Sequence, residues 1–236
     1  MIKDVFVKID KEFFNNLSSK ELLILLYLYN KSRTLQNFSF TLKDLISYYG
    51  FKPNPRKNQI NESFIQGLND LIHKKIITLN TTTIKNINQI IVCSFVFDDN
   101  YNTYFDNLDE FISCYNSEVD IIRQAVIQHK TLSTFERILA VFLYLKKFLN
   151  VNNPLKYSYP SLNTMMQDLN LSKPTILKAI TDLENLNFIY KKNIGNYIDS
   201  SGKIYICNNV YCFEDYDIND LKQVVSSSLY KFNKWY

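Results

Sequence analysis

The sequence is poor in the residues from which most catalytic sites are built. It contains two histidines, His73 and His129, and four glycines among 236 residues. The pattern G-x-x-x-x-G-K-[ST] is absent, and without this phosphate-binding loop an ATPase is not expected. A nickase that opens DNA with a tyrosine needs a pair of histidines spaced to hold a metal, and this pair is absent. Asp and Glu also do not cluster as they do in a two-metal nuclease. The sequence therefore predicts a protein that is not an enzyme.

Zinc-binding cysteine patterns and long apolar runs are also missing. The four cysteines stand at positions 93, 114, 207 and 212 without zinc-finger spacing, so we expect no metal site and no other cofactor. Scattered cysteines are typical of a reduced, intracellular protein. No run reaches the roughly 18–20 apolar residues of a membrane span, and the first residues do not resemble a signal peptide. We therefore expect a cytoplasmic protein without a membrane partner.

Acidic residues are scarce over most of the chain because they gather in one stretch. Residues 98–120 hold seven Asp or Glu and no Lys or Arg. The whole chain carries +4, and outside this stretch 27 basic residues stand against 16 acidic ones, which gives +11. Such an excess suits a polyanionic partner. Only four of the basic residues are arginines, so few bidentate contacts to guanine are available, and an AT-rich DNA site is expected.

What the sequence does contain is one structural plan, present twice. Ser18–Glu21 and Ser133–Glu136 both have the capping-box pattern S-x-x-E, and an apolar helix follows each box. Residues 41–51 then match residues 161–171 in their apolar spacing. A third helix follows in each copy, after a turn that the first copy enlarges with the segment FKPNPRKN.

Each copy ends in two strand-like runs around a polar loop. In the first copy these runs are residues 76–79 and 90–97, and in the second copy they are residues 188–191 and 204–213. Helix, helix, turn, helix and β-hairpin is the order of a winged helix-turn-helix, and the chain resembles that family twice. The resemblance implies an α+β, mostly helical fold with two tandem winged helix-turn-helix domains joined by an acidic and helical linker.

The expected domain boundaries follow from this order. The first winged helix domain covers residues 1–97, the linker residues 98–130 and the second winged helix domain residues 131–213. Residues 214–236 form a C-terminal tail, in which we expect a last amphipathic helix from Leu221 to Tyr236.

The third helix of the second copy is expected to read DNA. Ser172 is a good N-cap, Pro174 falls in the first turn, and Ile176, Leu177 and Ile180 belong to an apolar face. A helix fits the major groove, with its N-terminal residues near the base edges. The alternative is an ordinary solvated face on a core helix. The candidate residues are Ser172, Lys173, Thr175, Lys178 and Thr181 on the helix, and Lys191, Lys192, Asn193, Asn196 and Lys203 in the wing.

The first copy offers a second set of candidates. Asn and Gln are the natural bidentate partners of adenine, and Lys and Arg neutralise phosphates. Winged helices also serve as dimerisation modules, so this copy either binds DNA or forms a homodimer. The set comprises Asn58, Gln59, Asn61 and Gln66 around the third helix, and Lys52, Arg56 and Lys57 in the enlarged turn.

Two winged helices in one chain, with no ligand domain and no ATPase, resemble plasmid replication initiators. The resemblance implies that the C-terminal winged helix reads repeated AT-rich origin sites in double-stranded DNA and that host replication proteins are recruited. A plasmid or phage replication initiator is therefore the expected function. A transcriptional regulator of the same architecture is the alternative. A winged-helix scaffold for protein interactions is a third, and the +11 charge outside the acidic stretch argues against it.

Overall fold

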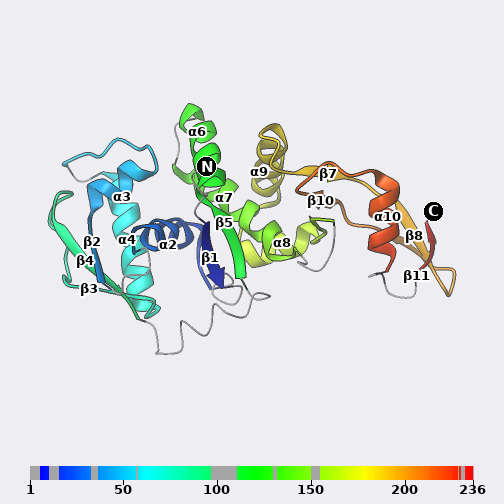
Figure 1. Ribbon diagram of the computed structural model, residues 1–236, viewed down its shortest axis with the longest axis horizontal. Coiled ribbons are helices and arrows are strands. Elements are labelled where there is room, and N and C mark those ends of the chain that lie inside the picture. The colour runs from blue at the N-terminus through cyan, green and yellow to red at the C-terminus, as the bar shows by residue number, and fades with distance from the viewer. Residues whose placement is uncertain are drawn as a thin grey trace. The chain divides into compact units, whose positions relative to one another are not determined.

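The computed structural model describes residues 6–10, 16–32, 37–56, 58–96, 111–129, 132–149, 155–227, 229 and 232–235. They form helices and small antiparallel sheets, which confirms the α+β, mostly helical fold (Figure 1). The chain divides into two compact units, Met1–Ala140 and Val141–Tyr236. The division falls inside helix α7 (Leu132–Lys147).

The first unit has the predicted order of elements. Helix α2 (Ser19–Ser32) precedes strand β2 (Asn37–Thr41), helices α3 (Leu42–Tyr48) and α4 (Gln59–His73), and the hairpin of β3 (Ile77–Leu79) and β4 (Ile90–Phe95). The strands form an antiparallel sheet in the order β2-β4-β3. Strand β2 is an addition that the sequence did not indicate.

Helix α2 begins with the predicted capping box and is buried on all sides. The N–H of Ser18 donates to the Glu21 carboxylate over 2.5 Å, and the N–H of Glu21 donates to Ser18 Oγ over 3.3 Å. Residues 22–28 are all buried. Helix α4 packs closely on α2, because a Cβ added at Gly67 would overlap Ile24 Cδ1.

Part of the predicted linker belongs to the first unit. Strand β5 (Phe111–Tyr115), which the sequence did not indicate, pairs antiparallel with β1 (Phe6–Asp10). Helix α6 (Asn116–His129) follows where a helix was expected. Its Arg123 donates to the carbonyl oxygen of Tyr48 over 2.6 Å, so a cation meets the negative C-terminal end of α3. Residues 97–110, which hold most of the acidic stretch, lie outside the described residues.

The second unit repeats the order with shorter strands. After α7 come β6 (Tyr157–Ser158), α8 (Leu162–Leu169), α9 (Lys173–Asn185), β7 (Tyr190–Lys192) and β10 (Val210–Cys212). Their sheet order, β6-β10-β7, corresponds strand for strand to that of the first unit.

A hydrogen bond and a turn position the helices of the second unit. The phenol of Tyr144 on α7 donates to Asp168 Oδ2 on α8 over 2.6 Å. Between α8 and α9 the turn contains Asn170 in the left-handed conformation, with φ 49°. The predicted capping box required Ser133 to lie just ahead of α7. The helix begins at Leu132, so Ser133 lies inside its first turn.

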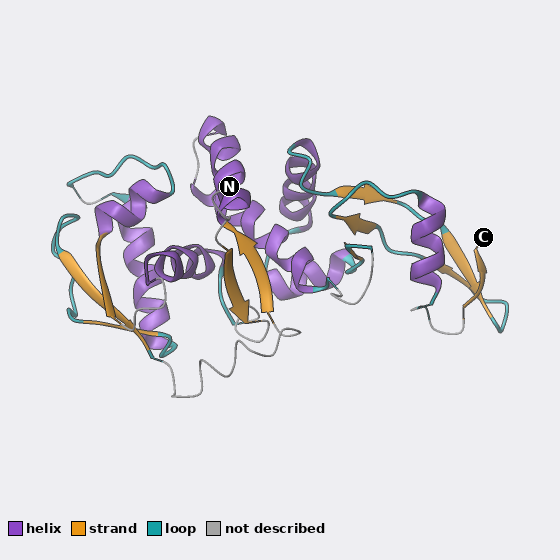
Figure 2. Ribbon diagram, in the orientation of Figure 1, coloured by secondary structure: helices purple, strands orange, loops and turns teal. Residues whose placement is uncertain are grey.

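The wing predicted for the second unit is wrong in detail. The chain inserts a second hairpin, β8 (Asn196–Asp199) and β9 (Ile204–Ile206), between β7 and β10. The predicted strand 204–213 is therefore two strands that belong to different sheets. A C-terminal strand, β11 (Phe232–Trp235), pairs with β8 and gives the sheet order β11-β8-β9 (Figure 2).

The C-terminal tail is also corrected. In place of a helix from Leu221 to the end, helix α10 (Ile218–Ser226) is followed by β11. Leu221 and Val225 of α10 join Ile194, Val210 and other residues in one buried cluster. The tail is thus part of the core of the second unit, and it supports the inserted hairpin.

Candidate nucleic-acid interface

Helix α9 separates a buried face from an exposed one. Ile176, Ala179, Ile180 and Leu183 are buried. Leu177, which the sequence placed with them, is 38% exposed. It lies one turn from both Lys173 and Thr181, on the side of the helix that faces solvent. The exposed residues of α9 are Lys173, Pro174, Leu177, Lys178, Thr181 and, at its last position, Asn185.

The N-terminus of α9 is not capped by a side chain. Ser172 has the extended backbone of an N-cap, as predicted, but its hydroxyl contacts Thr175 Oγ1 over 2.8 Å instead of a first-turn N–H. Pro174 has no N–H to satisfy. Within the described part of the chain, no side chain caps the N–H groups of Lys173 and Thr175. They are oriented to donate to an anion, which the helix dipole also attracts.

Other helices of the same chain are closed at this end. Thr41 caps α3, Asn58 caps α4, Ser161 caps α8 and Asp217 caps α10, each by accepting from a backbone N–H. The open end of α9 therefore distinguishes it from these four helices.

The electrostatics of the exposed face of α9 favour an anion. Lys173 and Lys178 are exposed, and neither forms an ion pair with a described residue. The acidic residues of α9, Asp182 and Glu184, lie in its last turns. Positive charge is thus concentrated at the same end as the open N–H groups.

The wing residues next to α9 differ in their availability. Lys191 is exposed, and its backbone N–H donates to Glu184 Oε1 over 3.3 Å. Lys192 Nζ lies 2.6 Å from Asp215 Oδ1, and this hydrogen bond raises the pKa of Lys192. The Lys192 side chain is only 26% exposed and its charge is compensated, so it is a weaker candidate than Lys191.

Asparagine residues shape the entry into the inserted hairpin. Asn193 Oδ1 accepts from the N–H of Gly195 over 2.9 Å, which fixes the bend after β7. Asn196 opens β8, opposite Ile206 of β9. Asn193 is exposed and Asn196 is half-buried.

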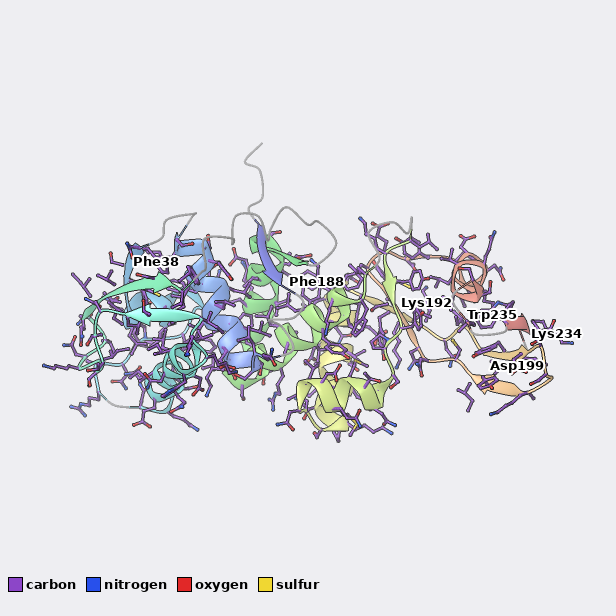
Figure 3. The ribbon with its side chains drawn as sticks, turned by 90° about the horizontal axis from the view of Figure 1, so that it is seen from below. Phe38, Phe188, Lys192, Asp199, Lys234 and Trp235 are labelled. Atoms are coloured by element: carbon purple, nitrogen blue, oxygen red, sulfur yellow. The ribbon has the colours of Figure 1, made fainter. Side chains whose placement is uncertain are left out.

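Lys203 is held on a rigid turn between β8 and β9. Asp199 Oδ1 accepts from the Ser201 hydroxyl over 2.6 Å and from the backbone N–H groups of Ser201 and Lys203 over 2.9 and 3.0 Å. These hydrogen bonds, led by that of the Ser201 hydroxyl, lower the pKa of Asp199. The Lys203 ammonium lies 4.9 Å from the centroid of the Tyr205 ring. Figure 3 places Asp199 at the same end of this unit as Trp235.

Two candidates of the first unit have structural roles. Asn58 Oδ1 caps α4 by accepting from the N–H of Asn61 over 2.8 Å. Asn61 is 5% exposed, and its side-chain amide donates to the carbonyl oxygens of Asn54 and Arg56 over 2.8 and 3.1 Å. Because this amide holds the enlarged turn, Asn61 has a structural role and is not available to contact bases.

The other candidates of the first unit are at its surface. Gln59, Lys52 and Arg56 are exposed, and Gln66 is exposed but donates to Asp70 Oδ1 over 2.7 Å. Lys57 lies outside the described residues.

The exposed side of α4 differs from that of α9 in charge and in shape. Helix α4 carries Glu62 in its first turn and Asp70 further on, and it has no Lys or Arg. The loop between β3 and β4 also lies over the helix. Between them is a pocket of about 530 Å³, lined by Glu62, Ile65, Gln66 and Asn69 of α4 and by residues 81–87 of the loop. Helix α4 therefore has a more negative net charge than α9, and the β3–β4 loop covers part of its exposed side.

Groups that could support other chemistry are few in the described part of the chain. No cluster of three or more His, Cys, Asp or Glu that could hold a metal is found there, and none of its helices is long and apolar enough to span a membrane. Burial raises the pKa of Cys93 to about 12 and that of Cys212 to about 11. Both thiols are thus protonated at neutral pH.

Comparisons with known proteins give little guidance. No protein-family model and no curated protein matches the chain. Among solved structures, a selenomethionine derivative of domains 2 and 3 of RctB is similar, with a TM-score of 0.38 and 9% sequence identity over 86% of this chain and 81% of that chain. Similarity this low does not establish a shared fold.

Proposed function

We propose that this chain binds double-stranded DNA in a sequence-specific manner and that α9 enters the major groove. The observation that carries the proposal is the N-terminal half of α9, where Lys173 and Lys178 are exposed beside uncapped N–H groups. The major groove, about 12 Å wide, admits a helix, and residues at its N-terminus then meet base edges and phosphates.

The exposed face of α9 offers contacts of more than one kind. Lys173 and Lys178 neutralise phosphates or donate to guanine, and the first-turn N–H groups donate to a phosphate. Leu177 and the methyl group of Thr181 suit the methyl group of thymine. This combination supports a site that contains A·T base pairs, as the scarcity of arginine also predicts.

The inserted hairpin and the first unit supply further contacts in this proposal. Lys191 on β7 and Lys203 in the turn of the hairpin are exposed cations and contact the DNA backbone. Lys52 and Arg56 do the same from the enlarged turn of the first unit. Helix α4 reads no bases, because Glu62 in its first turn repels phosphate and the β3–β4 loop covers part of its face.

We further propose that the biological setting is replication initiation on a plasmid or phage. Support comes from the tandem arrangement of two units of one plan, which resembles plasmid replication initiators. Recruitment of host replication proteins, a cytoplasmic location and a non-enzymatic role belong to the same proposal. The alternative is a transcriptional regulator. Direct repeats of the binding site favour an initiator, whereas a single palindrome in a promoter favours a regulator.

The test is a selection of binding sites from a random duplex library with the full chain, followed by fluorescence anisotropy titration of the selected duplex. Leu177→Glu places a carboxylate on the exposed face of α9 and should reduce affinity by at least about 30-fold, because two lost contacts of about 1–3 kcal/mol each weaken binding by at least about 2 kcal/mol. Ile121→Glu on α6 is the matched control, since Ile121 is likewise an exposed apolar helix residue, and it should bind like wild type. Equal affinities of the two variants would contradict the role of α9.

A further inference from the structure

Strand β9 is an edge strand with an unusually apolar exposed side. In the sheet order β11-β8-β9, which covers the described residues, it has a paired strand on one side only. Ile204 and Ile206 lie two residues apart and therefore share one face of the sheet. They are 52% and 86% exposed, and Ile206 is the most exposed large apolar side chain of the described residues.

The backbone of β9 has hydrogen-bonding groups directed away from the sheet. Asp199 N–H donates to the carbonyl oxygen of Lys203 over 3.0 Å, and Cys207 N–H donates to that of Gly195 over 3.3 Å. In an antiparallel pair, successive residues alternate between bonding to the neighbour and pointing away from it. The N–H and C=O groups of Ile204 and Ile206 therefore point to the open side of β9.

We propose that this open edge pairs with the same edge of a second copy of the chain. The strand reads Ile-Tyr-Ile and is symmetric about Tyr205. A two-fold antiparallel pairing centred on Tyr205 places Ile204 opposite Ile206 of the second copy. The outward N–H and C=O groups of the two isoleucines then bond to each other across the axis, so the edge is its own complement.

The side chains are compatible with this pairing on both faces of the sheet. On one face, Ile198 lies opposite Ile204, and the row continues to Ile206 of the second copy. On the other face, the stacked rings of Tyr197 and Tyr205, with centroids 5.2 Å apart, meet their equivalents at the axis. Lys203 falls opposite Cys207 of the second copy, so no like charges oppose each other.

A second copy fits the edge because the edge is its own complement and, among the described residues, no strand pairs with its open side. Natural sheets block open edges with Lys, Pro, bulges or short covering segments, and β9 itself carries no charged residue and no proline. The apolar area is small compared with the roughly 800 Å² per partner of a stable interface. We therefore expect a weak dimer that two adjacent DNA sites strengthen by raising the local concentration. The two copies pair without DNA, so this proposal does not rest on the proposed DNA binding.

The first test is sedimentation equilibrium of the full chain without DNA, from low to high micromolar concentration. The wild-type mass should rise toward that of a dimer with concentration. Ile206→Lys, at a position that is nearly fully exposed, should shift the midpoint of this rise at least about tenfold, since one unfavourable edge charge of about 1.4 kcal/mol has that effect. Ile90→Lys is the matched control: Ile90 is 68% exposed but lies on β4, in a different sheet from β9, so this variant should dimerise like wild type.

The second test locates the pairing by cross-linking. Lys203→Cys should form a disulfide with Cys207 of a second copy under mild oxidation, because opposed residues at such positions have Cα atoms about 4.5 Å apart. Within one chain the two positions are about 13 Å apart along the strand, which is too far for a disulfide. The double variant Lys203→Cys/Cys207→Ser should give no covalent dimer.

Three results would overturn the proposal. One is a constant monomer mass at every concentration together with no cross-link. Another is a dimer that Ile206→Lys leaves intact, which would place the interface elsewhere. A third is that Ile206→Ser binds a duplex with a single site more weakly than wild type does, at concentrations where wild type is monomeric. In that case β9 would contact DNA and not a second copy.

Discussion

Asn61 gives the sharpest separation between a structural and a DNA-reading residue. Asn61→Ala removes two hydrogen bonds, to the carbonyl oxygens of Asn54 and Arg56, from a side chain that is 5% exposed. Each bond of this kind contributes about 0.5–1.5 kcal/mol, so the variant should lower the free energy of unfolding by about 1–3 kcal/mol. Because the amide faces the turn, the base preference of the protein should not change.

The assay is urea unfolding followed by far-UV circular dichroism, combined with anisotropy titration against the selected duplex and single-base variants of it. Gln66→Ala is the control, since it removes a similar amide from an exposed position of the same helix and should change stability by no more than about 0.5 kcal/mol. An Asn61→Ala variant as stable as wild type, with altered base preference, would refute the reasoning and return Asn61 to the DNA-contacting set.

Three further predictions concern the fold. Gly67→Ala should destabilise the first unit by about 1–2 kcal/mol despite its better helix propensity, because the new methyl group overlaps Ile24 Cδ1, and adding Ile24→Val should remove most of this loss in a double-mutant cycle by urea unfolding. Tyr144→Phe should lower the unfolding free energy by about 1 kcal/mol through loss of the bond to Asp168, measured in the same way, and an unchanged value would remove this bond from the account. Since hydrogen bonds lower the pKa of Asp199, they should stabilise the folded protein at pH values above the ordinary aspartate pKa of about 3.9, and this stabilisation should be lost as the pH falls through the lower pKa of the folded state. NMR titration of this carboxyl group should show no midpoint above about 3.9.

Apolar periodicity and capping patterns were sufficient to predict the main elements. The capping box at Ser18, the enlarged turn before α4 and the helix after Ser172 are all at the predicted places. These features are local, because a cap or an amphipathic helix is specified by residues within one or two turns. For the same reason the order of helices and the first hairpin could be predicted.

The errors concern strands whose partners are far away in the sequence. Strand β11 pairs with β8, more than thirty residues earlier, and β5 pairs with β1 across about a hundred residues. A strand of three to five residues has little periodicity of its own, so its pairing is fixed by contacts that a local pattern does not contain. The sequence pattern therefore placed β8 in a polar loop, joined β9 to β10 in one strand and gave the tail as one helix.

The sequence was sufficient to predict which residues belong to the candidate site, but not how exposed each side chain is or which partners it has. Lys173 and Lys178 were identified from their spacing away from the apolar face, and both are exposed. The burial of Asn61, the pairing of Lys192 with Asp215 and the exposure of Leu177 depend on tertiary contacts. The missing cap of α9 could not be predicted either, because Ser is a favoured N-cap residue and only the geometry shows that the Ser172 hydroxyl does not accept from a first-turn N–H.

The central claim, that the N-terminal half of α9 binds DNA, is tested most directly by the salt dependence of binding to the selected duplex. If about six phosphates are contacted, the slope of log affinity against log salt should be near −5 for wild type. Lys173→Ala/Lys178→Ala should reduce its magnitude by about 1.8 and weaken specific binding, whereas Lys31→Ala/Lys43→Ala, which removes the same charge from exposed positions of the first unit, should leave both unchanged. The same slope and affinity for the α9 variant and the control would contradict the account.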